Sequence, residues 1–336
     1  MPVDACDVGS RVVVRSRLGG RGPGGGPAVT DVVGLLEQVD DEAITVRRRD
    51  GVVTRIPMAD VVAAKRISPV APRVGGRGLR VEPEELQRIT DSGWPAPVRE
   101  HLGEWLLRAA GGFTGRANSV SVHGEPGRPL APALRAVTDF YAAAQLPAMA
   151  QVVVGSRWER SFDAAGWITK PGSHAGALVQ VAAVRTALRS AGEPRRADPV
   201  QLDSHVSDDW LALYNRAGDR QAAVVRAVLE GPDRVVFARL GEPLRAIGRL
   251  VVDGDWAGIA AVEVAPEHRG RGLARLVVDA LLRRADVMHA RWCYLQTMPA
   301  NAAALGLYGR YGFTTHHTYR YLVPADQEQM TVSAGV

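Results

Sequence analysis

The sequence predicts an α/β (α+β) protein with a mixed central sheet flanked by helices, preceded by a smaller half of similar order and by a small N-terminal β-barrel. Three observations lead to this prediction. Residues 9–67 alternate between apolar and polar with period two, which is typical of short, half-buried strands. Beyond residue 80, strand-like runs alternate with helix-like segments. The order of these segments over residues 104–188 recurs over residues 246–323, which indicates an internal repeat.

Length and composition indicate a globular protein. The chain has 336 residues, enough for two or three domains of roughly 100–200 residues each. Its hydrophobic share of 46% and charged share of 23% are ordinary for a chain with a sizeable core. No apolar run approaches the roughly 18 residues of a membrane-spanning helix, and the N-terminus lacks a signal-peptide pattern. We therefore expect a cytoplasmic protein that does not engage a membrane.

Cysteines and charge exclude several classes of site. Cys6 and Cys293 have no CxxC partner and no neighbouring ligand cluster, so we expect neither a zinc site nor a disulfide. Only two of the 41 basic residues, Lys65 and Lys170, are lysines, a bias typical of a G+C-rich bacterial genome that explains the net charge of +5. The basic residues are scattered along the chain, so a nucleic-acid partner is not expected.

The first predicted domain, residues 1–70, is a small SH3-like β-barrel. Its expected strands are residues 11–17, 32–39, 43–49, 52–57 and 63–67, with a Gly/Pro-rich mobile loop over 19–27. Asp50-Gly51 is a strong hairpin signal between the third and fourth strands. Because no aromatic cluster marks its surface, the sequence favours a packing module. A reader of nucleic acid or peptide remains the alternative.

The remaining chain divides at a second linker, residues 189–199, after a first linker over 68–79. The middle domain, residues 80–195, is expected to contain helices over 83–90, 131–143 and 156–165, and strands over 105–109, 117–122, 148–154 and 176–188. The last domain, residues 200–325, is expected to contain helices over 208–214, 220–229, 273–284 and 301–311, and strands over 235–240, 246–252, 256–264, 292–297 and 314–323. Residues 326–336 read as a polar tail.

The sharpest chemical signal is a turn between a strand and a helix. The strand ends at Val264, and Pro266 interrupts the ladder. Gly270 and Gly272 then let a ligand approach the backbone, and Arg269 and Arg271 add positive charge. The helix that begins at Leu273 and Ala274 directs the positive end of its dipole at the same place. This pattern predicts a pyrophosphate site, although it is neither a dinucleotide fingerprint nor a Walker loop.

These residues resemble the acyl-CoA motif of the GNAT superfamily of N-acetyltransferases, Arg/Gln-x-x-Gly-x-Gly/Ala after a strand ending in Val-x-Pro. Arg269, Gly272 and Ala274 occupy the three fixed positions, and Val264-Ala265-Pro266 precedes them. The resemblance covers about residues 200–323. It implies a GNAT fold and acetyl-CoA (CoA) bound along Val262, Val264 and the turn from Arg269 to Ala274.

A second motif agrees with the first. The stretch from Asn301 to Phe313 resembles the family's Asn-x-x-Ala…Leu-Tyr-x-x-x-Gly-Phe helix, and Asn301 has the chemistry of an N-cap. The resemblance implies that Asn301 lies beside the pantetheine and that the Tyr308 hydroxyl lies near the CoA thiolate. A packed aromatic side chain is the alternative for Tyr308.

The first copy of the repeat is degenerate. In place of the Arg/Gly turn it has Gly124-Glu125-Pro126-Gly127-Arg128-Pro129, where prolines lack N–H groups and Glu125 repels phosphate. Phe162 stands where the second copy has Tyr308. We expect this GNAT-like half to bind no CoA and to be structural or to form one wall of the substrate cleft. The whole chain resembles bacterial tandem GNAT proteins with an N-terminal barrel.

The family reaction is attack of an amine on a thioester, which requires a base for the amine and a proton or hydrogen bond for the thiolate. Tyr308 is the candidate for the thiolate. Glu263 is the candidate base, since period two places it opposite Val262 and Val264 on an otherwise apolar strand. Weaker base candidates are His268 in the turn and the two histidines at the last strands, His316 and His317. Asp255 and Trp256 at a hairpin are candidates for lining the cleft.

The sequence therefore predicts an acetyl-CoA-dependent N-acetyltransferase with one CoA site and no metal. Small amines and protein amines remain open as acceptors, as do longer acyl groups. A non-catalytic acyl-CoA-binding protein is the alternative function. Monomer and homodimer are both open.

Overall fold

The computed structural model describes residues 11–21, 27–48, 52–66, 81–172, 174–191, 200–214 and 222–325. The chain divides into two compact units, Met1–Ala71 and Pro72–Val336. Both predicted linkers lie largely outside the described residues, as do the Asp50-Gly51 turn and the polar tail.

The N-terminal unit is a five-stranded antiparallel sheet of order β4-β3-β2-β1-β5. Its strands are β1 (Arg11–Arg21), β2 (Pro27–Val39), β3 (Ala43–Arg48), β4 (Val53–Pro57) and β5 (Val61–Arg66), with a 3₁₀ turn η2 (Met58–Asp60) before β5. Alternate residues of β1 and β3, including Val12, Val14, Ile44 and Val46, form its core. The five predicted strands are confirmed, but β1 and β2 extend into the predicted loop, of which residues 22–26 are not described.

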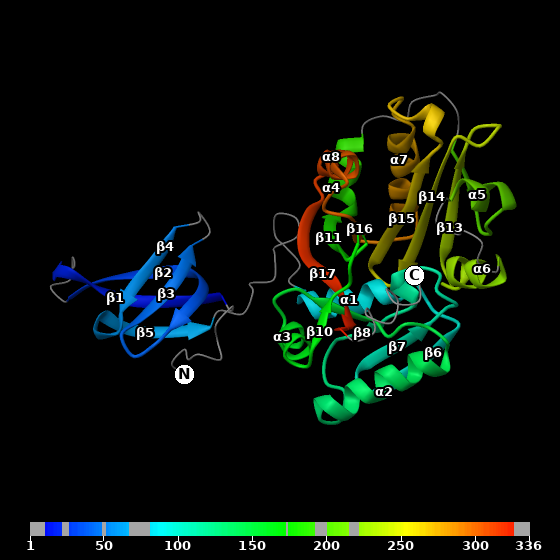
Figure 1. Ribbon diagram of the computed structural model, residues 1–336. Helices are drawn as coiled ribbons and strands as arrows, with labels where there is room; N and C mark the ends of the chain where they lie inside the picture. The colour runs from blue at the N-terminus through cyan, green and yellow to red at the C-terminus, as the bar shows by residue number, and fades with distance from the viewer. Residues whose placement is uncertain are drawn as a thin grey trace. The chain divides into compact units, whose positions relative to one another are not determined.

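The larger unit is built on one mixed sheet of twelve strands. Eleven of them follow the order β12-β13-β14-β15-β16-β11-β17-β9-β8-β7-β6, and β10 pairs with β17 (Figure 1). The strands are β6 (Val98–Leu102), β7 (Trp105–Ala109), β8 (Val120–Ser121), β9 (Ala150–Val153), β10 (Trp167–Thr169), β11 (Gly176–Ala183), β12 (Gln201–Asp203), β13 (Val235–Leu240), β14 (Ala246–Asp253), β15 (Trp256–Val264), β16 (Trp292–Thr297) and β17 (Thr314–Pro324). The pairs β15–β16 and β8–β9 are parallel and the others are antiparallel.

Eight α-helices accompany this sheet in the described part of the chain. They are α1 (Pro83–Asp91), α2 (Leu130–Ala143), α3 (Arg157–Ala164), α4 (Val184–Ala191), α5 (Asp208–Leu213), α6 (Ala222–Glu230), α7 (Leu273–Val287) and α8 (Ala302–Gly309). The order β6-β7-β8-α2-β9-α3-β10-β11 resembles the order β13-β14-β15-α7-β16-α8-β17, so the repeated element order expected from the sequence is present.

The two copies of this pattern exchange strands. β11 precedes residue 195 in the chain, yet it lies between β16 and β17 of the second copy. β17 in turn pairs through its later residues with β9 and β10 of the first copy. Figure 1 shows β11, β16 and β17 side by side. The halves therefore share one continuous sheet.

Several predicted elements differ from the structure. The predicted strand over residues 176–188 is wrong beyond Ala183, where helix α4 begins. The buried residues of α4, Val184, Ala187 and Ala191, belong to the same core as α7, so tertiary packing supports a helix that the apolar run alone did not indicate. Strands β6, β10 and β12 were not predicted. Of the two strands that pair with β7, β6 makes the longer pairing and β8 the shorter one.

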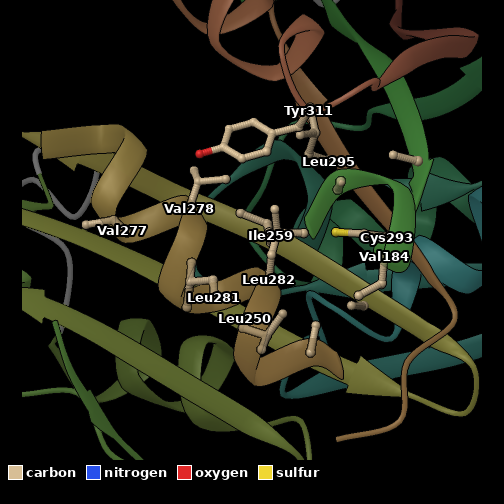
Figure 2. Packing of buried hydrophobic residues seen from close by; sticks show 14 of the residues in the cluster. Val184, Leu250, Ile259, Val277, Val278, Leu281, Leu282, Cys293, Leu295 and Tyr311 are labelled. Atoms are coloured by element: carbon tan, nitrogen blue, oxygen red, sulfur yellow. The ribbon is translucent and has the colours of Figure 1, made fainter. Parts of the chain in front are cut away.

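The core beneath the predicted phosphate turn is apolar. Figure 2 shows Val277, Val278, Leu281 and Leu282 of α7 among residues of β14, β15 and β16 such as Leu250, Ile259 and Leu295. A second core on the opposite side contains residues of α5 and α6 together with Phe237 and Ile247. The central strands are therefore covered on both faces, and this covering fixes the site at their ends.

Candidate active site

Strands β15 and β16 separate at the centre of the sheet. Their parallel pairing runs from Trp256 opposite Trp292 to Ile259 opposite Leu295, while β15 continues to Val264. A bulge accompanies this separation: the register of β15 against β14 shifts, and Ala261 has a φ of 52°. The edge of β15 that faces β16 is therefore left without a strand partner beyond Ile259.

The predicted turn joins β15 to helix α7. A short 3₁₀ turn, η4 (Pro266–His268), leads to Gly270 and Gly272, whose φ values of 76° and 80° are in the left-handed region. Gly272 is the N-cap residue of α7, and its carbonyl accepts from the N–H of Arg275 at 3.1 Å. The N–H groups of Leu273 and Ala274 between them have no partner within the helix. A Cβ at either glycine would meet no heavy atom within 4 Å, so the backbone here faces open space.

The arginines of this turn are exposed. Arg269 donates from Nε to the carbonyl of Val264 at 3.2 Å, and Arg271 is likewise exposed. Leu273 and Ala274 begin α7 and are half-buried. The predicted phosphate residues are therefore gathered at one helix N-terminus.

Helix α8 supplies the second group of predicted residues. Asn301 is its N-cap, as expected: Oδ1 accepts a hydrogen bond from the N–H of Ala304 at 3.0 Å. Tyr308 lies one helix length further on, is 8% exposed and packs on Phe313 with ring centroids 6.0 Å apart.

A cavity of about 810 Å³ is lined by residues of β15 and α8, but not by the glycine turn or α7. Among the predicted site residues, Val262, Glu263, Asn301 and Tyr308 line it. Val264 packs against the core under α7 instead. Glu263 is half-buried and lines the cavity together with its neighbour Val262, which also packs against that core, so the simple alternation expected from the sequence does not separate the two side chains here.

The first copy forms the other wall of this cavity. Trp94, Thr114, Arg116, Met149 and Lys170 line it together with residues of the second copy. Sequence reasoning missed these residues because nothing local marks them. It also missed Arg249, for which a signal existed: a charged residue in the apolar run of β14.

The turn of the first copy is filled by its own side chains. Glu104 accepts a hydrogen bond from the N–H of Glu125 at 2.8 Å, and Glu84 is 3.3 Å from the N–H of Gly124. Trp158 Nε1 donates to the carbonyl of Gly124 at 2.8 Å. Carboxylates thus occupy backbone donors that an anion would otherwise take.

The weaker candidates lie elsewhere. His316 and His317 are buried, with their Nδ1 atoms 2.9 Å apart, and contact Val81 and Gln87. Burial first, and the neighbouring imidazole second, lower the pKa of His317 to about 3. His268 lies in η4, and Asp255 pairs with Arg291 at 3.3 Å. None of these side chains lines the cavity described here.

The comparison with known families agrees with this geometry. The model described as "Probable histone acetyltransferase Rv0428c C-terminal" matches residues 84–322, more than half of the chain. The chain belongs to the Rv0428c family. The N-terminal model of the Rv0428c family, an Sm-like domain, matches residues 6–65. The family match thus covers both the barrel and the tandem unit.

Two relatives with acetyltransferase names are similar to this chain. The probable histone acetyltransferase Rv0428c of Mycobacterium tuberculosis is 29% identical over 333 residues, which cover 94% of this chain and 95% of the relative. The uncharacterized N-acetyltransferase YobR of Bacillus subtilis is 27% identical over 255 residues, covering 70% of this chain and 97% of the relative.

Among solved structures, a GCN5-related N-acetyltransferase from Kribbella flavida matches with a TM-score of 0.51 at 16% identity, covering 68% of this chain and 90% of that chain. This likeness shows the GNAT fold. The Rv0428c-family chain is therefore an acetyltransferase with the GNAT fold. Within the described ranges, no helix is long and apolar enough to cross a membrane.

Proposed function

We propose that the protein is an N-acetyltransferase that transfers an acetyl group directly from acetyl-CoA to a primary amine. The observation that carries the proposal is the convergence of three elements: the separated strand β15, the glycine turn at the N-terminus of α7 and the Asn301-capped helix α8. Residues of β15 and α8 line one cavity.

The donor fits the residues present. The pyrophosphate would be held by the first-turn N–H groups of α7, with Arg269 and Arg271 supplying charge. Gly270 and Gly272 leave open the space that a Cβ would occupy. The unpaired edge of β15 at Val262–Val264 would orient the pantetheine arm and polarise the thioester carbonyl through backbone N–H groups. Asn301 stands beside this path at the start of α8.

Two side chains supply the proton transfers. Glu263 lies on β15 at the cavity, where its carboxylate accepts a proton from the acceptor ammonium and frees the amine lone pair. Tyr308 lines the same cavity from α8, where its hydroxyl stabilises the departing thiolate. Holding both substrates in one cavity adds the entropic advantage of proximity.

One CoA site per chain is proposed. In the first copy, Glu104 and Glu84 accept hydrogen bonds from the turn, and Phe162 is buried against Trp105 and Trp167. Carboxylates at that turn repel phosphates, and Phe162 offers no hydroxyl.

Calorimetric titration with acetyl-CoA tests the donor site. Arg269→Glu is expected to weaken acetyl-CoA binding at least tenfold, because it places a carboxylate at the pyrophosphate. Arg128→Glu is a matched control, since Arg128 is an exposed arginine in the corresponding turn of the first copy. Equal binding by both variants would refute the assignment.

Thiol release in the presence of an amine panel distinguishes an enzyme from a protein that only binds acyl-CoA. An enzyme releases thiol in proportion to the N-acetylated product, which mass spectrometry identifies. Tight acetyl-CoA binding without amine-dependent release would favour the non-catalytic alternative. Longer acyl-CoA donors in the same assay report the acyl preference.

A further inference from the structure

Trp94 lies between two guanidinium groups in the wall of the cavity. The side chain follows helix α1 and is 4% exposed. The guanidinium carbon of Arg116 is 5.3 Å from its ring centroid, and that of Arg249 is 5.1 Å from it. The ring thus holds two cations close together in one wall of the site.

Arg249 is a buried charge without a carboxylate. It projects from β14, is 1% exposed, and donates to the carbonyls of Gly93 and Leu229 at 2.8 Å each. Burial lowers its pKa to about 10, which still leaves it charged near neutral pH. No carboxylate among the described residues forms an ion pair with it. Backbone carbonyls hold its position but leave its net charge in place.

Arg116 is the more available of the two cations. It lies in η3 (Gly115–Ala117), where Thr114 caps the turn through hydrogen bonds from Arg116 N and Ala117 N. Its Nε donates to Oε1 of Gln296 on β16, and the Tyr319 hydroxyl donates to the same oxygen at 2.9 Å. Gln296 takes Nε–H, and the Tyr319 hydroxyl also lies within hydrogen-bonding reach of the guanidinium, so part of the set of terminal N–H groups is available to a further partner. Over the described ranges, Arg116 also has no carboxylate at ion-pair distance.

The charges of the cavity do not balance. Arg116, Arg249 and Lys170 line it, whereas Glu263 is the carboxylate among its described lining residues. The proposed phosphate turn, with Arg269 to Leu273, is not part of this lining, so CoA phosphates there would not neutralise the excess. A concave, partly buried site with excess positive charge concentrates anions and repels cations.

We propose that the acceptor is a small amine that also carries a carboxylate, bound by Arg116 beside Trp94, and not a lysine-rich polypeptide. This inference rests on the proposed function. The two terminal nitrogens of a planar guanidinium match the two oxygens of a carboxylate. The surrounding aromatic side chains, Trp94, Tyr214, Tyr294, Tyr319 and Tyr321, supply apolar surface for the rest of an amino-acid-like molecule.

The reaction balances without a further reagent. The acceptor nitrogen forms a bond to the acetyl carbon as the carbon–sulfur bond breaks. One ammonium proton passes to Glu263, and the second proton that the nitrogen loses as the amide forms passes to the departing thiolate beside Tyr308. The products are an N-acetyl amino acid, CoA thiol and protonated Glu263, which returns its proton to solvent. Arg116 binds the carboxylate and takes no part in the transfer, so it determines specificity.

The test compares amines that differ only in the carboxylate. Each of the common amino acids is assayed beside its carboxamide, and a lysine-rich histone-tail peptide is included, with thiol release giving kcat/KM. The wild-type protein is expected to use at least one carboxylate at least tenfold better than its carboxamide. Arg116→Gln is expected to bring that ratio close to one, with an unchanged acetyl-CoA dissociation constant.

Two further variants keep the test decisive. Arg116→Lys keeps the charge without the paired donors and is expected to retain part of the preference for the carboxylate over its carboxamide. It also serves as the test variant if Arg116→Gln does not fold. Arg135→Gln is the control, since Arg135 is an exposed arginine on α2 outside the cavity.

Failure of this inference differs from failure of the proposed function. Acetylation of the peptide or the carboxamides as efficient as that of every carboxylate would overturn the inference alone. The inference alone would also be overturned if no amine that carries a carboxylate is acetylated while another amine is, or if the preference for the carboxylate survives in Arg116→Gln. Absence of thiol release with every amine would overturn both.

Discussion

Two glycines with matching backbone geometry separate the effect of the phosphate turn from that of backbone strain. Gly272 at the start of α7 has a φ of 80°, and Gly166 after α3 has a φ of 81°. A Cβ at either position would meet no heavy atom within 4 Å. Alanine therefore introduces the same left-handed strain, about 1–2 kcal/mol, in both variants and no clash in either.

The two variants should consequently unfold alike and bind differently. For a unit of this size we expect each Tm to fall by about 2–4 °C per kcal/mol. At Gly272 the added methyl group also stands beside the first-turn N–H groups of α7, so Gly272→Ala should weaken acetyl-CoA binding at least tenfold, or about 1.4 kcal/mol. Gly166→Ala should leave the dissociation constant within about twofold.

Differential scanning fluorimetry gives the Tm values, and calorimetric titration at one temperature gives the affinities. Equal affinity in the two variants would show that phosphate does not approach Gly272. An equal loss of affinity in both would show that strain alone weakens binding. Either result would refute the assignment of the donor site.

Three further predictions concern catalysis, the core and pH. Tyr308→Phe should slow acetyl transfer in single-turnover experiments by about 10- to 100-fold with little change in acetyl-CoA affinity, and full activity would remove the hydroxyl from the mechanism. Arg108→Met should lower the free energy of unfolding in urea by about 3–5 kcal/mol, because the buried Asp91 carboxylate, 2.6 Å from Arg108 Nη1, would lose this arginine. Adding Asp91→Asn should recover part of the loss. The pKa of His317 is about 3 in the folded protein, against 6.5 for an ordinary histidine, so its contribution to stability is present above pH 6.5 and is lost as pH falls towards 3. Between pH 6.5 and 5 that loss is about 2 kcal/mol, and His317→Gln should reduce this pH dependence in urea titrations, whereas an unchanged slope would contradict the assignment.

Local patterns were sufficient for the donor side of the site. Alternation predicted the strand β15, and capping chemistry predicted the start of α8 at Asn301. Gly270 and Gly272 have the left-handed conformation that their place in the turn suggested. Each of these features depends on residues within one element or its neighbour, which the sequence displays directly.

Long-range packing was beyond such patterns. The apolar run after Gly176 contains no proline or glycine at Val184 to show where the strand becomes a helix. The partners of β11 are more than 100 residues away in the chain, so its position in the sheet follows from tertiary structure alone. Arg116 reaches Gln296 for the same reason, whereas Arg249 could have been noticed as a charge within an apolar strand.

The exchange of β11 and β17 allows the two copies to bind different substrates while they share one sheet. Because each strand completes the sheet of the other copy, one continuous sheet ties the two walls of the cavity together. In a duplicated gene this arrangement would let the copy that carries Trp94 and Arg116 diverge and acquire a new acceptor, while the copy with the glycine turn retained the acyl donor. A fragment beginning after residue 195 would also lack β11, the strand between β16 and β17. Deleting the first copy should therefore abolish folding and not merely change specificity.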